Sequence, residues 1–312
     1  MQTSKTICRS NIALKHWFLL AAIASLLPQL LFASSFGDSL VVVYTGGMRG
    51  RAEGCGCSSG PQGGLDRRTT LLKQSLGDSP YFALDCGGIL DLDPDGGTAR
   101  SRCTISGLAR EGLKAISVSS RDLFYGTKFL ENLAKEAGVT LLSLNIVSTT
   151  GLRRTLYERW MTIDAAGKKI MVTGLTMPVQ TRSGLEQGSW IALSPDSIPS
   201  LLDTSRIADA SLVILLTDLD EASLRRFLLS TSVFDIAITS SQQVYSATPF
   251  RVRDCLVLHP DNDGRSFEAI IIPANGDVFN SRFLHQSVTR TTASDPTTAA
   301  FLKECMAKSP AK

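Results

Sequence analysis

Short apolar runs alternate with amphipathic segments through the first half of the chain. The apolar runs are rich in β-branched and aromatic residues and predict strands at Ser39–Tyr44, Tyr81–Asp85, Ala115–Val118 and Thr140–Asn145. The amphipathic segments place apolar side chains on one face and predict helices at Leu65–Leu76, Ile105–Leu113 and Lys128–Ala137. This alternation indicates a layered α/β domain.

The second half of the chain predicts further strands and fewer helices. Two buried strands, Ser211–Leu216 and Phe234–Thr239, flank a helix at Glu221–Leu229. Two antiparallel pairs are also expected, each joined by a turn. They are Arg154–Ile163 with Lys169–Thr176 through Asp164–Lys168, and Phe250–Leu258 with Phe267–Ile272 through Pro260–Gly264. We therefore expect a single domain over residues 38–286 with mixed sheets, followed by a loose polar tail over 287–312.

The first 35 residues have the pattern of a targeting segment. Lys5, Arg9 and Lys15 precede an apolar run from Trp17 to Ala33, and small residues follow it. This order predicts a secretory signal peptide over residues 1–35, with cleavage near Ser35 and a periplasmic or secreted product. The alternative is an uncleaved N-terminal anchor, which would be the chain's only expected link to a membrane.

The net charge changes once the leader is set aside. The whole chain has 32 basic and 29 acidic residues, a net charge of +3. The leader contributes three basic residues and no acid, so 29 of each remain and the net charge is zero. A neutral mature chain does not favour nucleic-acid binding through a basic face. The sequence identifies no partner, which is therefore unknown.

Histidine is scarce, and cysteine is not. The sequence has three histidines, and removal of His16 with the leader leaves His259 and His285. This nearly excludes a site that needs several imidazole ligands. Removal of Cys8 leaves an even set of cysteines, which permits disulfides in an exported protein. Their connectivity stays open, and the set is Cys55, Cys57, Cys86, Cys103, Cys255 and Cys305.

Several segments resemble a known family. Gly63–Thr70 (GGLDRRTT), Lys114–Gly126 (KAISVSSRDLFYG) and Leu142–Ile146 (LSLNI) carry the likeness and fall in the expected order. They resemble the N-terminal catalytic domain of the 5′-nucleotidase and UDP-sugar hydrolase branch of the calcineurin-like metallophosphoesterases. The resemblance implies a four-layer α-β-β-α sandwich with two mixed sheets. It also implies a centre of two divalent metals, held by Asp, His and Asn at strand ends.

The residues expected at that metal centre have been replaced. By the resemblance, the family's metal-binding positions fall on Gly47, Arg49, Gly88, Ser120, Arg121, Asp218, Ser241 and Gln243. Glycine, serine and arginine are poor ligands for divalent cations, so we expect no metal at the family site and no other cofactor. Arg49 and Arg121 would put fixed positive charge where the metals would bind. They are candidates for holding an anion, unless each is simply a solvated loop arginine.

A glycine-rich loop carries the remaining chemistry. Cys55-Gly56-Cys57 follows the first strand, and Cys86 follows the second. We expect the three thiols on one accessible rim, where they would serve redox chemistry, bind zinc or copper, or form a structural disulfide. The loop also resembles that of an exported bacterial subgroup with a Cys-Gly-Cys motif, some members of which contain selenocysteine.

Two acidic segments are weaker candidates. His259 with Asp261 and Asp263 suggests an oxygen-rich metal loop, although a hairpin turn is the simpler interpretation. The stretch that contains Asp85, Asp91, Asp93 and Asp95 suggests calcium, although a solvated loop is simpler.

The leading hypothesis is an exported, catalytically degenerate 5′-nucleotidase-like protein that uses its cysteine-bearing loop for redox, soft-metal or structural purposes. One alternative is a phosphoester or nucleotide hydrolase with an unconventional site at Asp122 and Asp218. The other is an anion-binding module built on Arg49 and Arg121.

Overall fold

The computed structural model describes residues 36–54, 63–150, 154–178, 189–241 and 248–308. Residues Gly37–Lys312 form one compact unit. The expected signal peptide lies outside the described residues. Among the helices of the described ranges, none is long and apolar enough to cross a membrane.

The first sheet has six strands in the order β14-β13-β1-β2-β3-β4. The strands β1 to β4 run parallel, and β13 pairs antiparallel with both β1 and β14. The carboxyl ends of the four parallel strands therefore meet at one edge of the sheet. The bounds are β1 Leu40–Thr45, β2 Tyr81–Asp85, β3 Leu113–Ser117, β4 Thr140–Leu142, β13 Ser266–Ile272 and β14 Arg282–Ser287.

The second sheet has six strands in the order β11-β12-β10-β9-β7-β6. Its four inner strands run parallel, and β6 and β11 are antiparallel edge strands. The bounds are β6 Met161–Ala165, β7 Lys168–Leu175, β9 Leu212–Thr217, β10 Ile236–Thr239, β11 Phe250–Val252 and β12 Cys255–Leu258. A small third sheet pairs β5 Ile146–Ser148 with β8 Trp190–Ala192.

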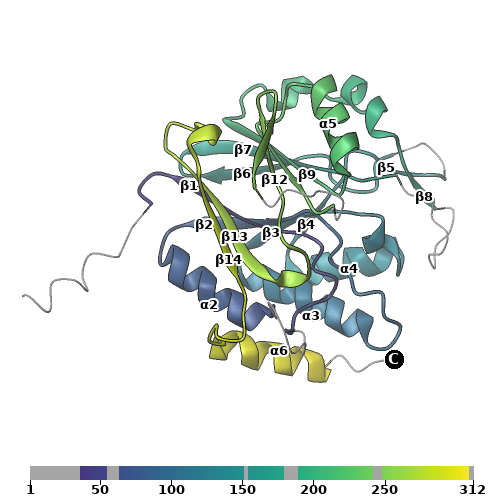
Figure 1. Cartoon of the computed structure of the whole chain (residues 1–312). Coiled ribbons are helices and arrows are strands. Elements are labelled where there is room, and N and C mark those ends of the chain that lie inside the picture. The colour runs from purple at the N-terminus through teal and green to yellow at the C-terminus, as the bar shows by residue number, and fades with distance from the viewer. Residues whose placement is uncertain (1–35, 55–62, 151–153, 179–188, 242–247, 309–312) are drawn as a thin grey trace, which may run out of the picture. The chain divides into compact units, whose positions relative to one another are not determined.

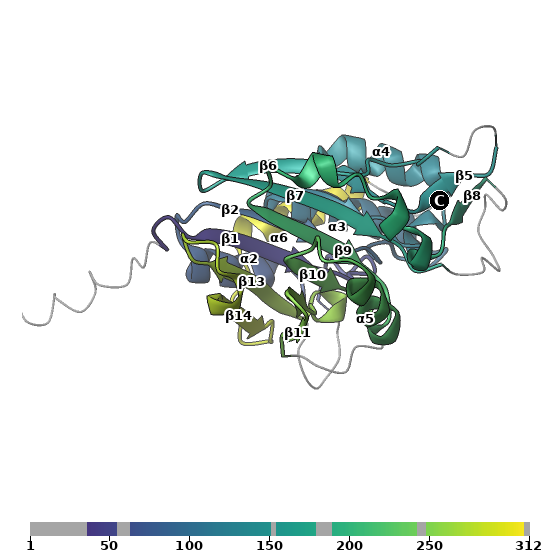
Figure 2. The same cartoon turned by 90° about the horizontal axis from the view of Figure 1, so that it is seen from above.

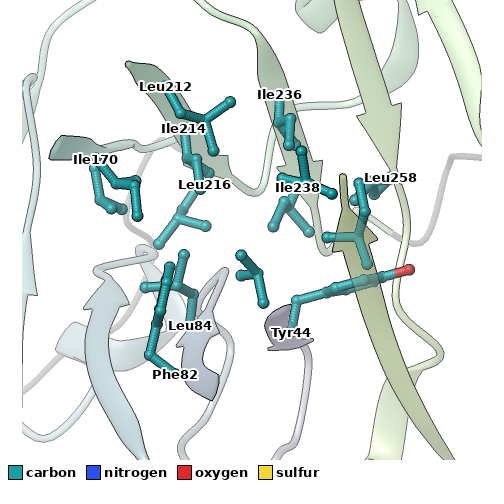
Figure 3. Packing of buried hydrophobic residues seen from close by; sticks show 14 of the residues in the cluster. Tyr44, Phe82, Leu84, Ile170, Leu212, Ile214, Leu216, Ile236, Ile238 and Leu258 are labelled. Carbon is teal, nitrogen blue, oxygen red and sulfur yellow. The ribbon is translucent and has the colours of Figure 1, made fainter. Parts of the chain in front are cut away.

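The two large sheets pack face to face around the main core. Figure 3 shows Phe82 and Leu84 of the first sheet beneath Leu216 of the second, and Tyr44 beneath Leu258. These side chains alternate along their strands with side chains on the outer faces, which is the pattern of a sandwich core. Seen from above, the second sheet lies over the first, and the parallel strands of the two sheets run in similar directions (Figure 2).

Helices cover the outer faces of both sheets (Figure 1). The helices α2 Leu65–Leu76, α3 Gly97–Arg110 and α4 Thr127–Ala137 lie on the first sheet, and α5 Glu221–Ser230 lies on the second. Apolar residues of α5, among them Leu224 and Phe227, pack with the outer side chains of the second sheet. The four-layer α-β-β-α arrangement with two mixed sheets is confirmed.

The predicted hairpin between Phe250–Leu258 and Phe267–Ile272 is wrong. The strand β12 belongs to the second sheet and β13 to the first, so Pro260–Gly264 crosses from one sheet to the other. We call residues 259–264 the crossover. The strand β12 pairs antiparallel with β11 instead, inside the segment expected to be one strand. A Pro-Asp-Asn-Asp-Gly sequence permits a tight turn, but it does not determine which sheet each strand joins.

The expected loose tail is also wrong for most of its length. Residues Pro296–Lys308 form the helix α6, which packs on α2 and α3. A disulfide joins Cys305 of α6 to Cys103 of α3, and the Asp295 carboxylate accepts a hydrogen bond from Lys73 at 2.5 Å. These contacts hold α6 in place. Its sequence has no marked apolar face, so the helix was not predicted.

Helix α3 starts earlier than predicted, at Gly97 instead of Ile105. Its buried face includes Ser101, Cys103 and Thr104, so an apolar periodicity does not reveal its first two turns. Leu113, predicted to end this helix, begins strand β3.

Candidate functional site

A pocket of about 550 Å³ opens where the loops after the parallel strands meet. Each of these loops follows the carboxyl end of a strand in one of the two large sheets, which is where open α/β sheets place their ligand sites. The sandwich thus brings both sets of loops together. The pocket is lined by Gly47, Arg49, Gly88, Ser119, Arg121, Met177, Asp218, Asp220, Ser240, Ser241 and Asn262.

Most of the positions predicted from the resemblance line this pocket. They are Gly47, Arg49, Gly88, Arg121, Asp218 and Ser241. Ser120 caps the 3-10 helix Arg121–Leu123 and is not part of the lining. Gln243 lies outside the described residues.

Glycine is required at two of the pocket loops because other chain segments approach them closely. A Cβ atom on Gly47 would lie 1.8 Å from Oδ1 of Asn262, and one on Gly87 would lie 2.4 Å from the carbonyl oxygen of Ser117. Both glycines have positive φ, at 58° and 90°. The loops after β1 and β2 therefore pack directly against the crossover and the end of β3.

Two guanidinium groups enter the pocket from different loops. The Arg49 side chain lies 3.6 Å from the Asp263 carboxylate, and both residues have positive φ although neither is glycine. The Arg121 side chain is half-buried, and its Nε donates to the carbonyl oxygen of Leu90 at 3.0 Å. Burial lowers the pKa of Arg121, and the positive charge of Arg49 lowers it further. The two cations thus lie close enough to repel each other.

Asp122 organises the loop after β2 and does not line the pocket. Its Oδ2 accepts from the Gly88 N–H (2.8 Å), the Ser119 N–H (3.0 Å) and the Ser119 hydroxyl (2.7 Å). Its Oδ1 accepts from the N–H groups of Ile89 (2.8 Å) and Leu90 (3.2 Å). A carboxylate offers about four lone-pair sites, so this one is saturated. The hypothesis that Asp122 is a catalytic or metal-binding group is therefore wrong.

Asp218 is the pocket carboxylate with the most perturbed acidity. Burial raises its pKa to about 7, and the charge of Asp122 adds to this effect, while the N–H of Met177 donates to Oδ1 at 2.6 Å and opposes it. Asp220, which also lines the pocket, caps α5 by accepting from the N–H of Ser223 at 2.9 Å. That hydrogen bond holds the pKa of Asp220 below its ordinary value.

The structure corrects the expected position of Cys86. Its side chain is fully buried in the core between the sheets, because it points inward immediately after β2. Burial raises the pKa of the thiol well above its usual range, and the neighbouring Asp85 raises it further. Cys86 is therefore neither an accessible thiol nor a member of a redox rim.

The other cysteines divide into distinct groups. Cys103 and Cys305 form the disulfide between α3 and α6, and Cys255 is buried. Cys55 and Cys57 lie outside the described residues. The described residues on either side of this segment are joined by a hydrogen bond, which the Leu65 N–H donates to the carbonyl oxygen of Ala52 at 2.9 Å.

The two acidic segments do not form the sites considered for them. In the crossover, Nε2 of His259 donates to the carbonyl oxygen of Ser241 at 2.6 Å. The backbone N–H of Asp261 donates to Glu268, and the Asp263 carboxylate pairs with Arg49. In the other segment, the Arg100 guanidinium binds Asp91 at 2.6 Å and Asp93 at 2.8 Å. Arg100 thus supplies the positive charge that calcium would have supplied. Asp85, in turn, is fully buried and accepts a hydrogen bond from Thr45 at 2.7 Å.

Sequence reasoning missed several lining residues, of which Asn262 is the most informative. Its Oδ1 is buried without a hydrogen-bond partner among the described residues, at the pocket wall. Asn262 was not predicted to line the pocket because the crossover was interpreted as a hairpin turn. Ser119, Met177, Asp220 and Ser240 were missed too, although each lies one to three residues beyond the end of a strand.

Comparison with solved structures identifies the fold. The sulfate thiohydrolase SoxB of Thermus thermophilus, in complex with glycerol, superposes with a TM-score of 0.72 at 15% identity, covering 86% of this chain and 60% of that one. A 5′-nucleotidase precursor, also from Thermus thermophilus, gives 0.70 at 14% identity, covering 86% and 59%. The calcineurin-like phosphoesterase YfkN of Bacillus subtilis gives 0.67 at 16% identity, covering 87% and 97%.

The chain has the fold of the 5′-nucleotidase-like metallophosphoesterases. A scan against models of protein families and a search of curated proteins find no match. The chain spans about 60% of the length of the first two structures that it resembles. At these identities the likeness establishes the 5′-nucleotidase-like fold, and the activity has to be argued from the pocket itself.

Proposed function

We propose that the protein is an exported, catalytically degenerate member of the 5′-nucleotidase-like fold that binds a phosphate-like or sulfate-like anion in its pocket. The carrying observation is that two arginines, Arg49 and Arg121, line the pocket from separate loops. Guanidinium groups recognise such anions through charge-assisted and often paired hydrogen bonds.

The chemistry of the lining argues against two resident divalent metals. Gly47 and Gly88 offer no side-chain ligand, and Arg49 and Arg121 bring positive charge that would repel cations. Asp218 and Asp220 are the carboxylates of the lining, and Asp220 is engaged at the start of α5. The pocket residues therefore do not fit the metal pair that this fold holds in its hydrolases, and we derive no hydrolytic step through it.

The fold neighbours support the class of ligand. Their names describe a sulfate thiohydrolase, a 5′-nucleotidase and a phosphoesterase. Sulfate and phosphate groups share a tetrahedral set of oxygens, which two converging guanidinium groups would recognise in the same way. We infer that this chain retains the binding of such a group and has replaced metal charge with arginine charge.

The cysteine-bearing loop is a second functional element of this proposal. Cys103, Cys305, Cys86 and Cys255 are either paired or buried, which leaves Cys55 and Cys57 for redox, soft-metal or structural use. Titration of thiols in the native protein, with and without reductant, tests this. Two reactive thiols that are gained on reduction by the wild type and not by Cys55→Ser/Cys57→Ser would support a Cys55–Cys57 disulfide, because reduction of Cys103–Cys305 would also release two thiols. Two reactive thiols before reduction would support a free pair.

Calorimetric titration with sodium sulfate and with inorganic phosphate, in buffer containing a chelator, tests the anion pocket. We expect saturable binding by the wild type and a loss of at least about tenfold in affinity for Arg121→Ala, since a hydrogen bond to a charged group contributes about 1.5–3 kcal/mol. Arg206→Ala, on an exposed 3-10 turn, is the matched control. Equal affinities for all three proteins, or no binding by any of them, would overturn the proposal.

A further inference from the structure

A second polar cluster lies outside the pocket, on the antiparallel side of the first sheet. Glu268 of β13 and His285 of β14 are directly opposed in the strand register. The His285 Nδ1 lies 3.4 Å from Oε1 of Glu268, and its Nε2 lies 3.7 Å from Oδ2 of Asp261 in the crossover. We call Asp261, Glu268 and His285 the acid-histidine cluster.

Burial makes the charge of this cluster significant. The Glu268 side chain is only 2% exposed, although it is a carboxylate. Its Oε1 accepts hydrogen bonds from the Asp261 N–H, at 2.9 Å, and from the Ser266 hydroxyl. A buried carboxylate is stable only when hydrogen bonds and positive charge compensate for its lost hydration. Neither hydrogen-bond donor carries a charge. The buried Arg68 guanidinium acts on Glu268 from inside the protein, and a cation on the open side of the cluster would add to its effect.

The open side is where His285 and Asp261 lie. Their side chains are 50% and 43% exposed, so an ion from solvent can reach both. With a neutral imidazole, the two carboxylates give the cluster a charge of −2, which a divalent cation would cancel.

The ligand set and its spacing fit a transition metal. One ligand atom from each residue lies within 4.8 Å of the others. Zinc bonds nitrogen and oxygen at about 2.0–2.2 Å, so tetrahedral ligand atoms lie about 3.3–3.6 Å apart. Zinc binding therefore requires the partly exposed Asp261 and His285 side chains to rotate until one ring nitrogen and both carboxylates converge. Imidazole with carboxylates suits zinc, whereas calcium and magnesium prefer oxygen alone.

We propose that Asp261, Glu268 and His285 form a mononuclear zinc site, separate from the pocket that corresponds to the family's metal centre. The three residues lie on β13, β14 and the crossover, and none of them lines the pocket. Bound zinc would tie the crossover to the edge of the first sheet. Asn262, the next residue in the crossover, lines the pocket, so zinc would also fix that wall.

Zinc titration of the full chain, stripped of metal and monitored by competition with a chromophoric chelator, tests this site. Because Cys55 and Cys57 could also capture zinc, the titration is repeated with the Cys55→Ser/Cys57→Ser variant. We expect one zinc ion to remain bound in that background. Adding His285→Ala should weaken its binding by at least about 100-fold, more than the loss typical of an outer-sphere partner.

The matched control is His259→Gln, which alters the other histidine of the described residues and should leave zinc affinity within about twofold. A second readout is the midpoint of thermal unfolding, which zinc should raise in the wild type and not in His285→Ala. Glu268→Gln should behave like His285→Ala. Zinc binding that survives both of these substitutions, or that disappears entirely in the cysteine variant, would overturn the proposal.

Discussion

The pocket and the acid-histidine cluster lie on either side of one short crossover and have opposite chemistry. The pocket lies where the resemblance places the family's metal centre, yet its lining includes Arg49 and Arg121. The cluster lies on the paired strands β13 and β14 and on the crossover, and it gathers two carboxylates and an imidazole. Asp261 belongs to the cluster, while the next residue, Asn262, lines the pocket.

The difference shows that the position of a pocket in a fold and the chemistry of that pocket are separate properties. The loops after parallel strands create a pocket whatever residues they carry, because sheet topology brings them together. What the pocket binds depends on the sign of the charges placed there. In this chain we expect the pocket to take anions and the cluster to take a cation, and the two should respond to different substitutions.

The largest expected effect separates the two regions directly. In Arg49→Ala/Arg121→Ala, sulfate affinity should fall by at least about 100-fold, because two hydrogen bonds to a charged group are lost. Zinc affinity should stay within about twofold, since neither arginine contacts the cluster. Calorimetry with each ligand measures both quantities. Parallel losses would mean that the two regions act as a single site.

A smaller effect concerns the pH dependence of the pocket. Burial raises the pKa of Asp218 to about 7, so this carboxyl is largely neutral at pH 6 and largely ionised at pH 8. Sulfate stays a dianion over this range, and its affinity should fall about tenfold as the added negative charge repels it. Calorimetry at both pH values measures the change.

Two asparagine substitutions sharpen the pH test. Asp218→Asn should make sulfate affinity nearly independent of pH, because the titrating group is gone. Asp220→Asn should keep the full dependence, since the pKa of Asp220 is held low by its hydrogen bonds at the start of α5 and this group stays ionised throughout. If the pH dependence persisted in Asp218→Asn and disappeared in Asp220→Asn, the titrating group would be Asp220 and not Asp218.

A still smaller effect on sulfate affinity is expected from the acidic residue that pairs with Arg49. The Asp263 carboxylate lies 3.6 Å from that guanidinium and competes with a bound anion for it. Asp263→Asn should therefore raise sulfate affinity about two- to fivefold, the range typical of a weak ion pair. Asp254→Asn, which alters an exposed partner of Arg251, is the control. Weaker binding by Asp263→Asn would show that Asp263 supports the site instead of competing with the ligand.

The smallest effect is expected at Cys86. Cys86→Ala should leave both sulfate and zinc affinities within about twofold, because the thiol is buried in the core and touches neither ligand. Its thiol should also resist modification in the native wild type and react only after unfolding. Rapid native-state labelling of Cys86, followed by mass spectrometry, would contradict its assignment to the core.

Much of the fold could be predicted because local patterns agree with tertiary packing. The bounds of α2 and β2 match their apolar patterns residue for residue. The positions of Arg49, Arg121 and Asp218 around one pocket followed from the resemblance and from the convergence of strand ends.

The remaining features depend on contacts between distant segments. A turn sequence at Pro260–Gly264 suits either a hairpin or a crossover, and only sheet membership distinguishes them. The disulfide partners Cys103 and Cys305 are 202 residues apart, beyond any local signal. The acid-histidine cluster depends on the register of β13 and β14 and on the course of the crossover. Nothing in the sequence therefore indicated that Glu268 and His285 lie side by side.

The central claim is that arginine charge has replaced metal charge in the pocket. The most direct test measures sulfate affinity by calorimetry twice, once with excess chelator and once with added manganese, alongside a phosphomonoesterase assay in both buffers. The account predicts equal affinities within about twofold and no turnover in either buffer. Sulfate binding or phosphoester hydrolysis that appears only with manganese would contradict it.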